Sequence, residues 1–270
     1  MFEPYDTIPL KLWEMLLNEN MDYHVGYPDG PSENVFLNTA YLYYPYLKDK
    51  KKILDAGCGF GGLSRNLKTL LPDLEITAVT NSEMHYDYGV NHPSEGINYV
   101  LSDLNEWSND EKFDAVIFNQ SFSHMNNDVV SRINTDLVLM VDFLGGFDGQ
   151  EDLNMEGVNV YARSMDSMEN IFSSAGFEIK EFNSRSDWWY FGMYKPWYEN
   201  MTNILSKYRK NQLGHFSGVD DALQDFHETL INHFGSIENI DENNLPEKTP
   251  ENTSIMYGLL SFIVAESVDN

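Results

Sequence analysis

A dense group of glycines constrains this chain more than any other feature of its sequence. Gly57, Gly59, Gly61 and Gly62 follow the apolar pair Ile53–Leu54 and precede leucines at helical spacing. A strand, a glycine-rich loop and a helix form the first unit of a doubly wound α/β sheet. Gly57 and Gly59 suit a tight turn that a ligand approaches closely, because a Cβ atom there would block it. The helix that begins near Gly62 would point its unpaired N–H groups at that ligand.

The glycine spacing leaves more than one ligand open. Gly57-x-Gly59-x-x-Gly62 fits the dinucleotide fingerprint, which predicts NAD. A nicotinamide enzyme needs Asp or Glu after its second strand to bind the ribose, but here Asn81 and Ser82 follow that strand. A tight turn without a ligand is the third interpretation, and the entropic cost of glycine disfavours it.

Composition limits the classes of partner. The chain has 270 residues and a formal charge of −26, so polyanions such as nucleic acid and anionic membranes are disfavoured. No apolar run approaches 18 residues, which predicts no membrane span. The single cysteine, Cys58, excludes an internal disulfide, and we interpret it as a small buried residue rather than a nucleophile. The first residues lack the features of a signal peptide, so a cytoplasmic location is expected.

Apolar runs and helical periodicities alternate along the chain. Strands are expected near residues 53–54, 74–80, 97–104, 113–118, 136–143, 177–182 and 256–265, with helices at 34–47, after 62 and at 167–175. This order predicts a right-handed parallel sheet, with ligands bound beyond the carboxyl ends of its strands. The loops after the first four strands carry polar residues that would meet at that edge: Asp55, Gly57, Thr80, Ser82, Asp103, Asn119 and Gln120.

The run from Ile53 to Gly59 closely resembles motif I of the class I methyltransferases that use S-adenosylmethionine (SAM). Three more stretches resemble the small-molecule group that includes tocopherol and natural-product methyltransferases and cyclopropane-fatty-acid synthases. His24-Val25-Gly26-Tyr27 resembles a His-x-Gly-Tyr segment ahead of motif I. Residues 78–85 resemble Gly-Val-Thr-Leu-Ser-x-x-Gln, from which Asn81 and His85 depart. Residues 119–126 resemble the segment after strand four, with Gln120 where several relatives carry Glu.

The resemblance implies an α/β fold, a Rossmann-like doubly wound sheet of seven strands whose last strand is antiparallel. It also implies a helical insertion between strands six and seven. The chain then divides into an N-terminal helical lid (1–47), a SAM-binding core (48–184), a helical substrate-lid insertion (185–253) and the last strand (254–270). Together these segments form a single methyltransferase domain.

The resemblance also implies the residues of the site. Asp103 would accept a hydrogen bond from the adenine amine, and Tyr23 or Tyr27 would face the cationic sulfur. The implied cofactor-binding residues are Tyr23, Tyr27, Asp55, Gly57, Gly59, Thr80, Asn81, Ser82, Asp103, Leu104, Asn119 and Gln120. His124 is the candidate catalytic base, and a structural histidine is the alternative. We expect no metal site, because His215, His227 and His233 lack ligand spacing.

These features predict a SAM-dependent methyltransferase that acts on a small metabolite by in-line transfer to O, N or C. The aromatic stretch Trp188–Tyr198 in the expected insertion suggests a hydrophobic, aromatic or isoprenoid-like acceptor. Two alternatives stay open: a SAM-binding protein without turnover, and a NAD-dependent oxidoreductase. A homodimer is compatible with either kind of enzyme.

Overall fold

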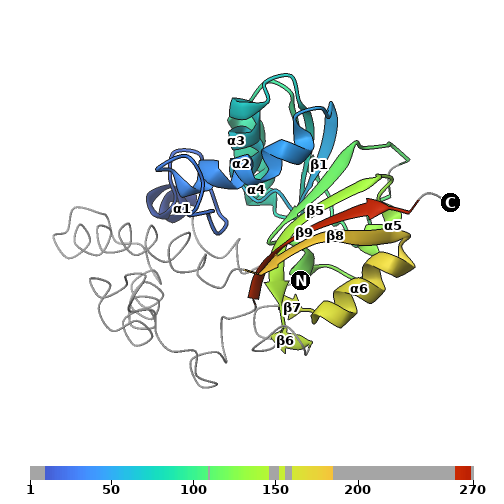
Figure 1. Ribbon diagram of the computed structural model, residues 1–270. Coiled ribbons are helices and arrows are strands. Elements are labelled where there is room, and N and C mark those ends of the chain that lie inside the picture. The colour runs from blue at the N-terminus through green and yellow to red at the C-terminus, as the bar shows by residue number, and fades with distance from the viewer. Residues whose placement is uncertain (1–9, 109, 146–151, 156–159, 185–258, 269–270) are drawn as a thin grey trace, which may run out of the picture.

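A seven-stranded sheet forms the centre of the computed structural model, which describes residues 10–108, 110–145, 152–155, 160–184 and 259–268 (Figure 1). Its strands, in spatial order, are β3 (Ile97–Leu101), β2 (Glu75–Thr80), β1 (Lys52–Ala56), β4 (Ala115–Asn119), β5 (Leu137–Leu144), β9 (Leu259–Ser267) and β8 (Phe177–Ser184). The first five strands in this order pair in parallel, and β9 is antiparallel to both β5 and β8. The doubly wound fold with an antiparallel last strand is therefore confirmed.

The central strands are buried on both faces, which explains their nearly continuous apolar sequences. In β1, Ile53 belongs to one apolar layer and Leu54 to the opposite layer. In β4, Ile117 and Phe118 divide between the layers in the same way. All four side chains have an exposed fraction of 0%. The alternation of a strand thus places successive side chains in two separate cores.

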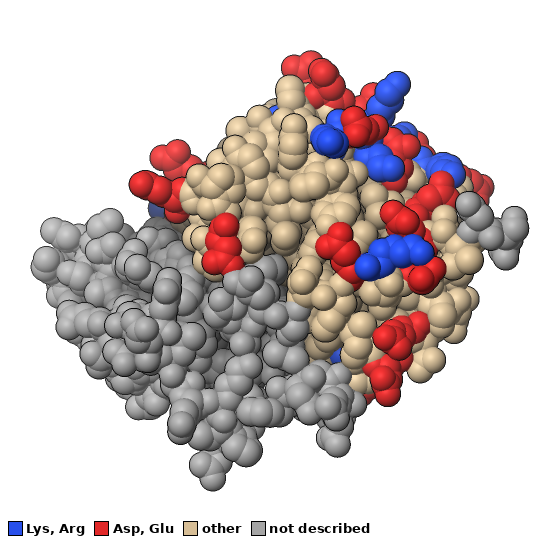
Figure 2. Space-filling view, in the orientation of Figure 1, with Lys and Arg blue, Asp and Glu red and all other residues tan. Residues whose placement is uncertain are grey.

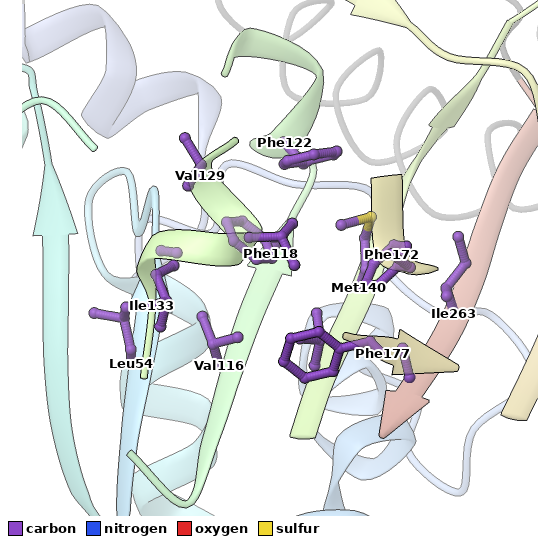
Figure 3. Packing of buried hydrophobic residues seen from close by; sticks show 14 of the residues in the cluster. Leu54, Val116, Phe118, Phe122, Val129, Ile133, Met140, Phe172, Phe177 and Ile263 are labelled. Atoms are coloured by element: carbon purple, nitrogen blue, oxygen red, sulfur yellow. The ribbon is translucent and has the colours of Figure 1, made fainter. Parts of the chain in front are cut away.

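Helices cover both faces of the sheet (Figure 1). The first core joins the strands to α2 (Val35–Leu47) and α3 (Gly62–Leu70), and the second joins them to α5 (Val129–Arg132) and α6 (Met165–Ser174). Figure 3 shows Phe172 of α6 beside Met140 of β5 in the second core. Two further helices are α1 (Leu10–Leu16) and α4 (Glu83–Asn91).

Polar side chains define where several helices begin. The side chain of Asn34 accepts hydrogen bonds from the N–H groups of Phe36 and Leu37 at the start of α2. Ser164 caps α6 by accepting from the N–H of Ser167, so α6 begins at Met165, two residues before the predicted start. Such caps satisfy N–H groups that the helix leaves without a partner.

Two local predictions differ from the structure. No strand was expected between residues 143 and 177, but Leu153–Met155 (β6) pairs with Val160–Ala162 (β7) as a small antiparallel sheet. The third strand ends at Leu101 rather than at Leu104, because Asp103 begins a turn in which its Oδ1 accepts from the N–H of Asn105. The predicted helical insertion at 185–253, its aromatic stretch and the three scattered histidines lie outside the described residues.

Charged side chains of both signs mix on the described surface. Figure 2 shows Lys and Arg among Asp and Glu on the visible face, without a continuous basic area there. Lys112 pairs with Asp136, and Lys180 pairs with Glu178 at 2.6 Å. Within the described ranges, no helix has the length and apolar character needed to cross a membrane.

Candidate functional site

The carboxyl ends of β1, β2, β3 and β4 bring most of the predicted site residues to one edge of the sheet. Asp55 in β1 is in register with Ala78 of β2 and with Ile117 of β4. The N–H groups of Gly57 and Cys58 both donate to the carbonyl of Val79, at 2.9 and 2.8 Å. These bonds join the glycine loop to the end of the neighbouring strand β2.

The glycine loop adopts backbone conformations that only glycine takes at low cost. Gly57 has a φ of +87°, and a Cβ atom on it would lie 2.5 Å from the Cβ of Ser121 in the loop after β4. Gly59 has a φ of +54°, but a Cβ atom there would meet nothing within 4 Å. Gly57 is therefore required by close packing, whereas Gly59 borders open space.

Asp55 is a buried carboxylate at the end of β1, with an exposed fraction of 1%. Its Oδ2 accepts a hydrogen bond of 2.6 Å from the hydroxyl of Ser64 in α3. Burial raises the pKa of Asp55 to about 6, although the Ser64 hydrogen bond and the charge of Arg65 oppose the shift. A carboxylate held in this way costs stability at neutral pH, so its position calls for a functional explanation.

The loops after β2 and β3 combine structural and accessible polar groups. The hydroxyl of Ser82 accepts from the N–H of His85 and so begins α4, while Thr80 is buried with 4% exposed. Asn81 is exposed, and Asp103 is partly exposed beside the buried Leu104. Ser82 thus has a capping role that the sequence interpretation did not foresee.

Residues 21–27, which we call the cover segment, contact α3 on one side and the loop after β4 on the other. On one side, Asp22 is fully buried, and its Oδ1 accepts from the Nδ2 of Asn66 in α3 at 2.8 Å. On the other side, the N–H of Val25 donates to the Oε1 of Gln120 at 2.9 Å. Tyr23 lies between these contacts and packs edge-on against Trp13 at 4.8 Å between ring centroids.

In the rest of the cover segment, His24 is buried and Tyr27 is partly exposed. Burial lowers the pKa of His24, against the opposing charge of Asp22, so the imidazole is neutral near pH 7. Its Nε2 is buried and has no hydrogen-bond partner among the described residues. Tyr27 is partly exposed, and its N–H donates to the carbonyl of Val35 at 2.8 Å.

Asn119 ends β4 and Gln120 follows it, and the two side chains differ in their contacts. The Oδ1 of Asn119 accepts from the hydroxyl of Tyr43 in α2 at 2.9 Å. The amide of Gln120 is directed to Val25, so the structure gives it a protein partner rather than leaving it as an evident ligand contact. Tyr43 is fully buried, and burial with the charges of two aspartates raises the pKa of its hydroxyl well above the ordinary value.

His124 lies in a short 3-10 helix, η2 (Phe122–His124), directly after this edge. The buried Asp142 of β5 accepts from the N–H of Ser123 at 3.1 Å, and burial raises the pKa of Asp142, although the hydrogen bonds from the N–H groups of Phe143 and Ser123 oppose the shift. Arg163, directly after β7, donates to the carbonyls of Phe122, at 3.0 Å, and of Met125. Two buried charged groups thus hold the turn that carries His124.

Sequence reasoning missed several of these supporting residues. All of them are buried, with exposed fractions of 4% for Asp142 and 2% or less for Ser64, Asp22 and Arg163. Buried polar side chains of this kind belong to hydrogen-bond networks, but a single sequence gives no sign of their burial. The signal that could have identified Asp142 is a charge inside the apolar run of β5.

Two further predictions concern side-chain chemistry. Desolvation raises the pKa of the Cys58 thiol well above its ordinary value, and the charge of Asp55 raises it further. A protonated thiol is a weak nucleophile. Within the described ranges, no group of three His, Cys, Asp or Glu side chains is arranged to hold a metal ion.

This geometry fits an adenosine-containing cofactor such as SAM. Gly59 borders open space, and a Cβ atom added to Gly59 would occupy part of that space. The carboxylates of Asp55 and Asp103 lie at the same edge of the sheet. Carboxylates accept hydrogen bonds from hydroxyl and amino groups, which such a cofactor presents. No described acid ends β2, where the dinucleotide fingerprint would require one.

Comparison with known proteins defines the class. Residues 53–139 match the sequence model of a family described as a methyltransferase domain. The matched segment runs from β1 to the first residues of β5 and includes the glycine loop, and the strand order of the sheet agrees with the Rossmann-like fold of class I methyltransferases. The resemblance of motif I is therefore confirmed.

Individual relatives agree with this class. N-methyltransferase 4 of Papaver somniferum is 31% identical over 87 residues, which cover 30% of this chain and 24% of that protein. The chain thus spans about a quarter of the length of this curated relative.

Solved structures of other proteins share this fold. A coclaurine N-methyltransferase bound to N-methylheliamine and S-adenosylhomocysteine (SAH) has a TM-score of 0.68, 14% identity, and coverage of 96% of this chain and 81% of its own. A cyclopropane synthase from Mycobacterium tuberculosis has a TM-score of 0.68, 12% identity, and coverage of 97% and 94%. At these identities the likeness shows the fold alone.

Proposed function

We propose that this protein is a SAM-dependent methyltransferase that acts on a small molecule. The observation that carries the proposal is the open side of Gly59 next to the buried carboxylate of Asp55, inside the segment that matches the methyltransferase domain. In a turn that binds no ligand, a buried carboxylate would lower stability without a gain, and a glycine beside free space would cost folding entropy without a need for close approach.

Residues at the strand edge would hold the cofactor. Gly57 and Gly59 allow close approach to the backbone, and Asp55 fixes the polar end of the glycine loop through Ser64. Thr80, Asn81 and Ser82 would border the ribose, and Asp103 with Leu104 would border the adenine. When bound, SAM supplies a methyl group that its sulfonium has already activated for displacement.

The cover segment would close the site on its outer side. Tyr23 and Tyr27 are both partly exposed, so each keeps aromatic surface available. The face of a tyrosine ring attracts a cation, which favours a positively charged sulfur over a neutral one. Exclusion of water and alignment of the two reactants would supply much of the rate, so a strong base is not obligatory.

His124 is our candidate for proton removal from the acceptor. It is partly exposed in η2, and Asp142 and Arg163 fix the backbone of that turn from the interior. An imidazole can take a proton near pH 7 without a large change in its environment. In this proposal, Asp142 and Arg163 position the turn and do not touch the acceptor.

The proposed acceptor is a small hydrophobic or aromatic metabolite. The relatives include N-methyltransferases, and one solved neighbour carries N-methylheliamine. The mixed surface charge and the net charge of −26 favour a small acceptor over nucleic acid. We further propose that the enzyme acts in the cytoplasm and that it can form a homodimer.

Calorimetric titration with SAM, SAH and NAD under the same conditions tests the cofactor. Micromolar binding of SAM and SAH, without binding of NAD, is the expected result. Binding of NAD alone, or of none of the three, would contradict the proposal. Small acceptors would then be screened by the gain of one methyl mass, and SAM binding without product for any acceptor would favour the alternative of a binding protein.

A further inference from the structure

We infer that Gln120 is a positioning residue: through a paired contact with Val25, its side chain holds the cover segment in place across the cofactor site. This inference rests on the proposed function, because it assigns a role within the same site. Gln120 was expected to bind the cofactor, and its contacts indicate that it acts through the cover segment instead.

Both ends of the Gln120 amide contact the backbone of one residue. Its Oε1 accepts from the N–H of Val25 at 2.9 Å, and its Nε2 donates to the carbonyl of Val25 at 3.4 Å. The second contact is long, so the first contributes more of the attraction. Only this assignment of the amide oxygen and nitrogen satisfies both backbone groups. The side chain thus pairs with both backbone groups of Val25, 95 positions away in sequence, as the backbone of a neighbouring β-strand would.

The backbone of Gln120 adopts a conformation that is costly for its residue type. Its φ is +58°, and Met21, at the start of the cover segment, has a φ of +52°. Within the described ranges, these are the two non-glycine residues with positive φ. Left-handed conformations of such residues persist where surrounding contacts enforce them, and they gather at functional sites. Here Met21 begins the cover segment, and Gln120 contacts Val25 near its other end.

Neighbouring contacts leave Gln120 little freedom to move. Its N–H donates to the carbonyl of Val141 in β5 at 2.6 Å, which fixes the backbone beside the sheet. Ser121, the next residue, packs on Gly57 so closely that a Cβ atom on Gly57 would lie 2.5 Å away. The Gln120 side chain therefore projects from a rigid base at the junction of the first and fourth strand loops.

The opposite end of the cover segment has its own anchor. Gly62, at the start of α3, leaves the space that Asp22 fills, because a Cβ atom there would lie 2.4 Å from the Oδ1 of Asp22. Arg65 of α3 donates to the carbonyl of Asn20 at 2.5 Å. With one end held by α3 and the other by Gln120, the segment must pass the glycine loop, and Tyr23 lies between the anchors.

Three substitutions separate positioning from folding. Gln120→Glu keeps the size of the side chain but turns a carboxylate toward the carbonyl of Val25. Gln120→Asn keeps the amide and tolerates a positive φ, but it is one methylene too short. Gln120→Gly removes the side chain and relieves the backbone strain. We expect Asn and Gly to leave the melting temperature unchanged or higher, although both release Val25.

The readout is the affinity for SAH, measured by calorimetry on the full chain, and steady-state kinetics with SAM. Loss of the paired contact should raise the Kd for SAH about tenfold in all three variants. The KM for SAM should rise by a similar factor, while kcat at saturating SAM changes less than twofold. If Gln120 had only a structural role, its substitution would lower the melting temperature and would not raise KM selectively over kcat.

Two failures are distinguishable. If the parent protein does not bind SAH, the proposed function itself is refuted. If the parent binds SAH and all three folded variants bind it within twofold of the parent, the positioning role of Gln120 is overturned while the proposed function stands. A lower kcat with an unchanged KM would also overturn it, because the effect would then lie in the chemical step.

Discussion

Replacement of Asp55 by Asn should make the protein more stable at neutral pH and weaken its binding of SAM. The carboxylate is buried with 1% of the residue exposed, and burial raises its pKa to about 6. An amide oxygen can still accept the hydrogen bond that the Ser64 hydroxyl donates at 2.6 Å. Asp55→Asn therefore removes the buried charge and retains the main contact.

The sign follows from proton linkage. In the unfolded chain the pKa of Asp is about 3.9, and in the folded protein that of Asp55 is about 6, so the folded state binds the proton more tightly. Stability is then highest at low pH, falls as the pH rises from about 4 to about 6, and stays reduced above that range. A difference of roughly two pKa units corresponds to about 3 kcal/mol in full.

The measurement is urea unfolding of parent and Asp55→Asn at pH 4.5 and pH 8. Of the full effect, about 1 kcal/mol is already present at pH 4.5, so the advantage of Asn should grow by about 2 kcal/mol between the two conditions. Any cost of the new amide hydrogens is independent of pH and cancels in this comparison. The titration of Asp142 cancels as well, because both proteins contain it.

An equal stability difference at both pH values would refute the reasoning, because desolvation of a charge is its only basis. The binding arm is separate: SAH affinity should fall in Asp55→Asn even where the protein is more stable. Unchanged affinity would remove Asp55 from the proposed cofactor site and leave its pKa shift without a functional explanation.

The remaining predictions concern the glycine loop and the turn that carries His124. Gly59→Ala and Gly176→Ala should each cost about 1 kcal/mol, because both glycines have positive φ and open space around an added Cβ, but only Gly59→Ala should abolish SAH binding in calorimetry. Equal affinities for this pair would contradict the site. Arg163→Lys should cost at least about 2 kcal/mol in thermal or urea unfolding, since a lysine cannot replace the forked contacts to backbone carbonyls. His124→Asn should lower kcat by about a hundredfold or more while the Kd for SAH stays within twofold; a kcat equal to that of the parent would make His124 a structural residue.

Much of the sheet could be predicted because its strands are buried on both faces. The stretches 115–118 and 137–141 are apolar throughout, and the expected strands at 113–118 and 136–143 overlap β4 and β5 almost completely. The glycine cluster located the first turn, since few other structures require so many glycines together. The hairpin of β6 and β7 was missed because strands of three residues carry no periodic signal.

The sequence was enough to predict which edge of the sheet carries the site, but not which hydrogen-bond partners hold the side chains there. The topology alone places Asp55, Asp103 and Asn119 on one side, because parallel strands share a direction. The role of Gln120 depends on a contact with Val25, 95 residues away in sequence, and that of Ser82 on the hydrogen bond by which it caps α4. Such choices between partners are made by tertiary packing, which local sequence does not encode.

Features that cost stability gather where the proposed site lies. Asp55 is a buried carboxylate, Gly57 and Gly59 hold left-handed turns, and Gln120 bears a positive φ without being a glycine. Asp55 and Gln120 could each be replaced by a residue that favours folding, whereas the positive φ of Gly57 and Gly59 makes any other residue there costly. What these four residues share is their position at the ends of the neighbouring strands β1 and β4. Because strain and buried charge persist at binding and catalytic sites when function requires them, their concentration at this edge argues for a ligand there independently of the match to known methyltransferases.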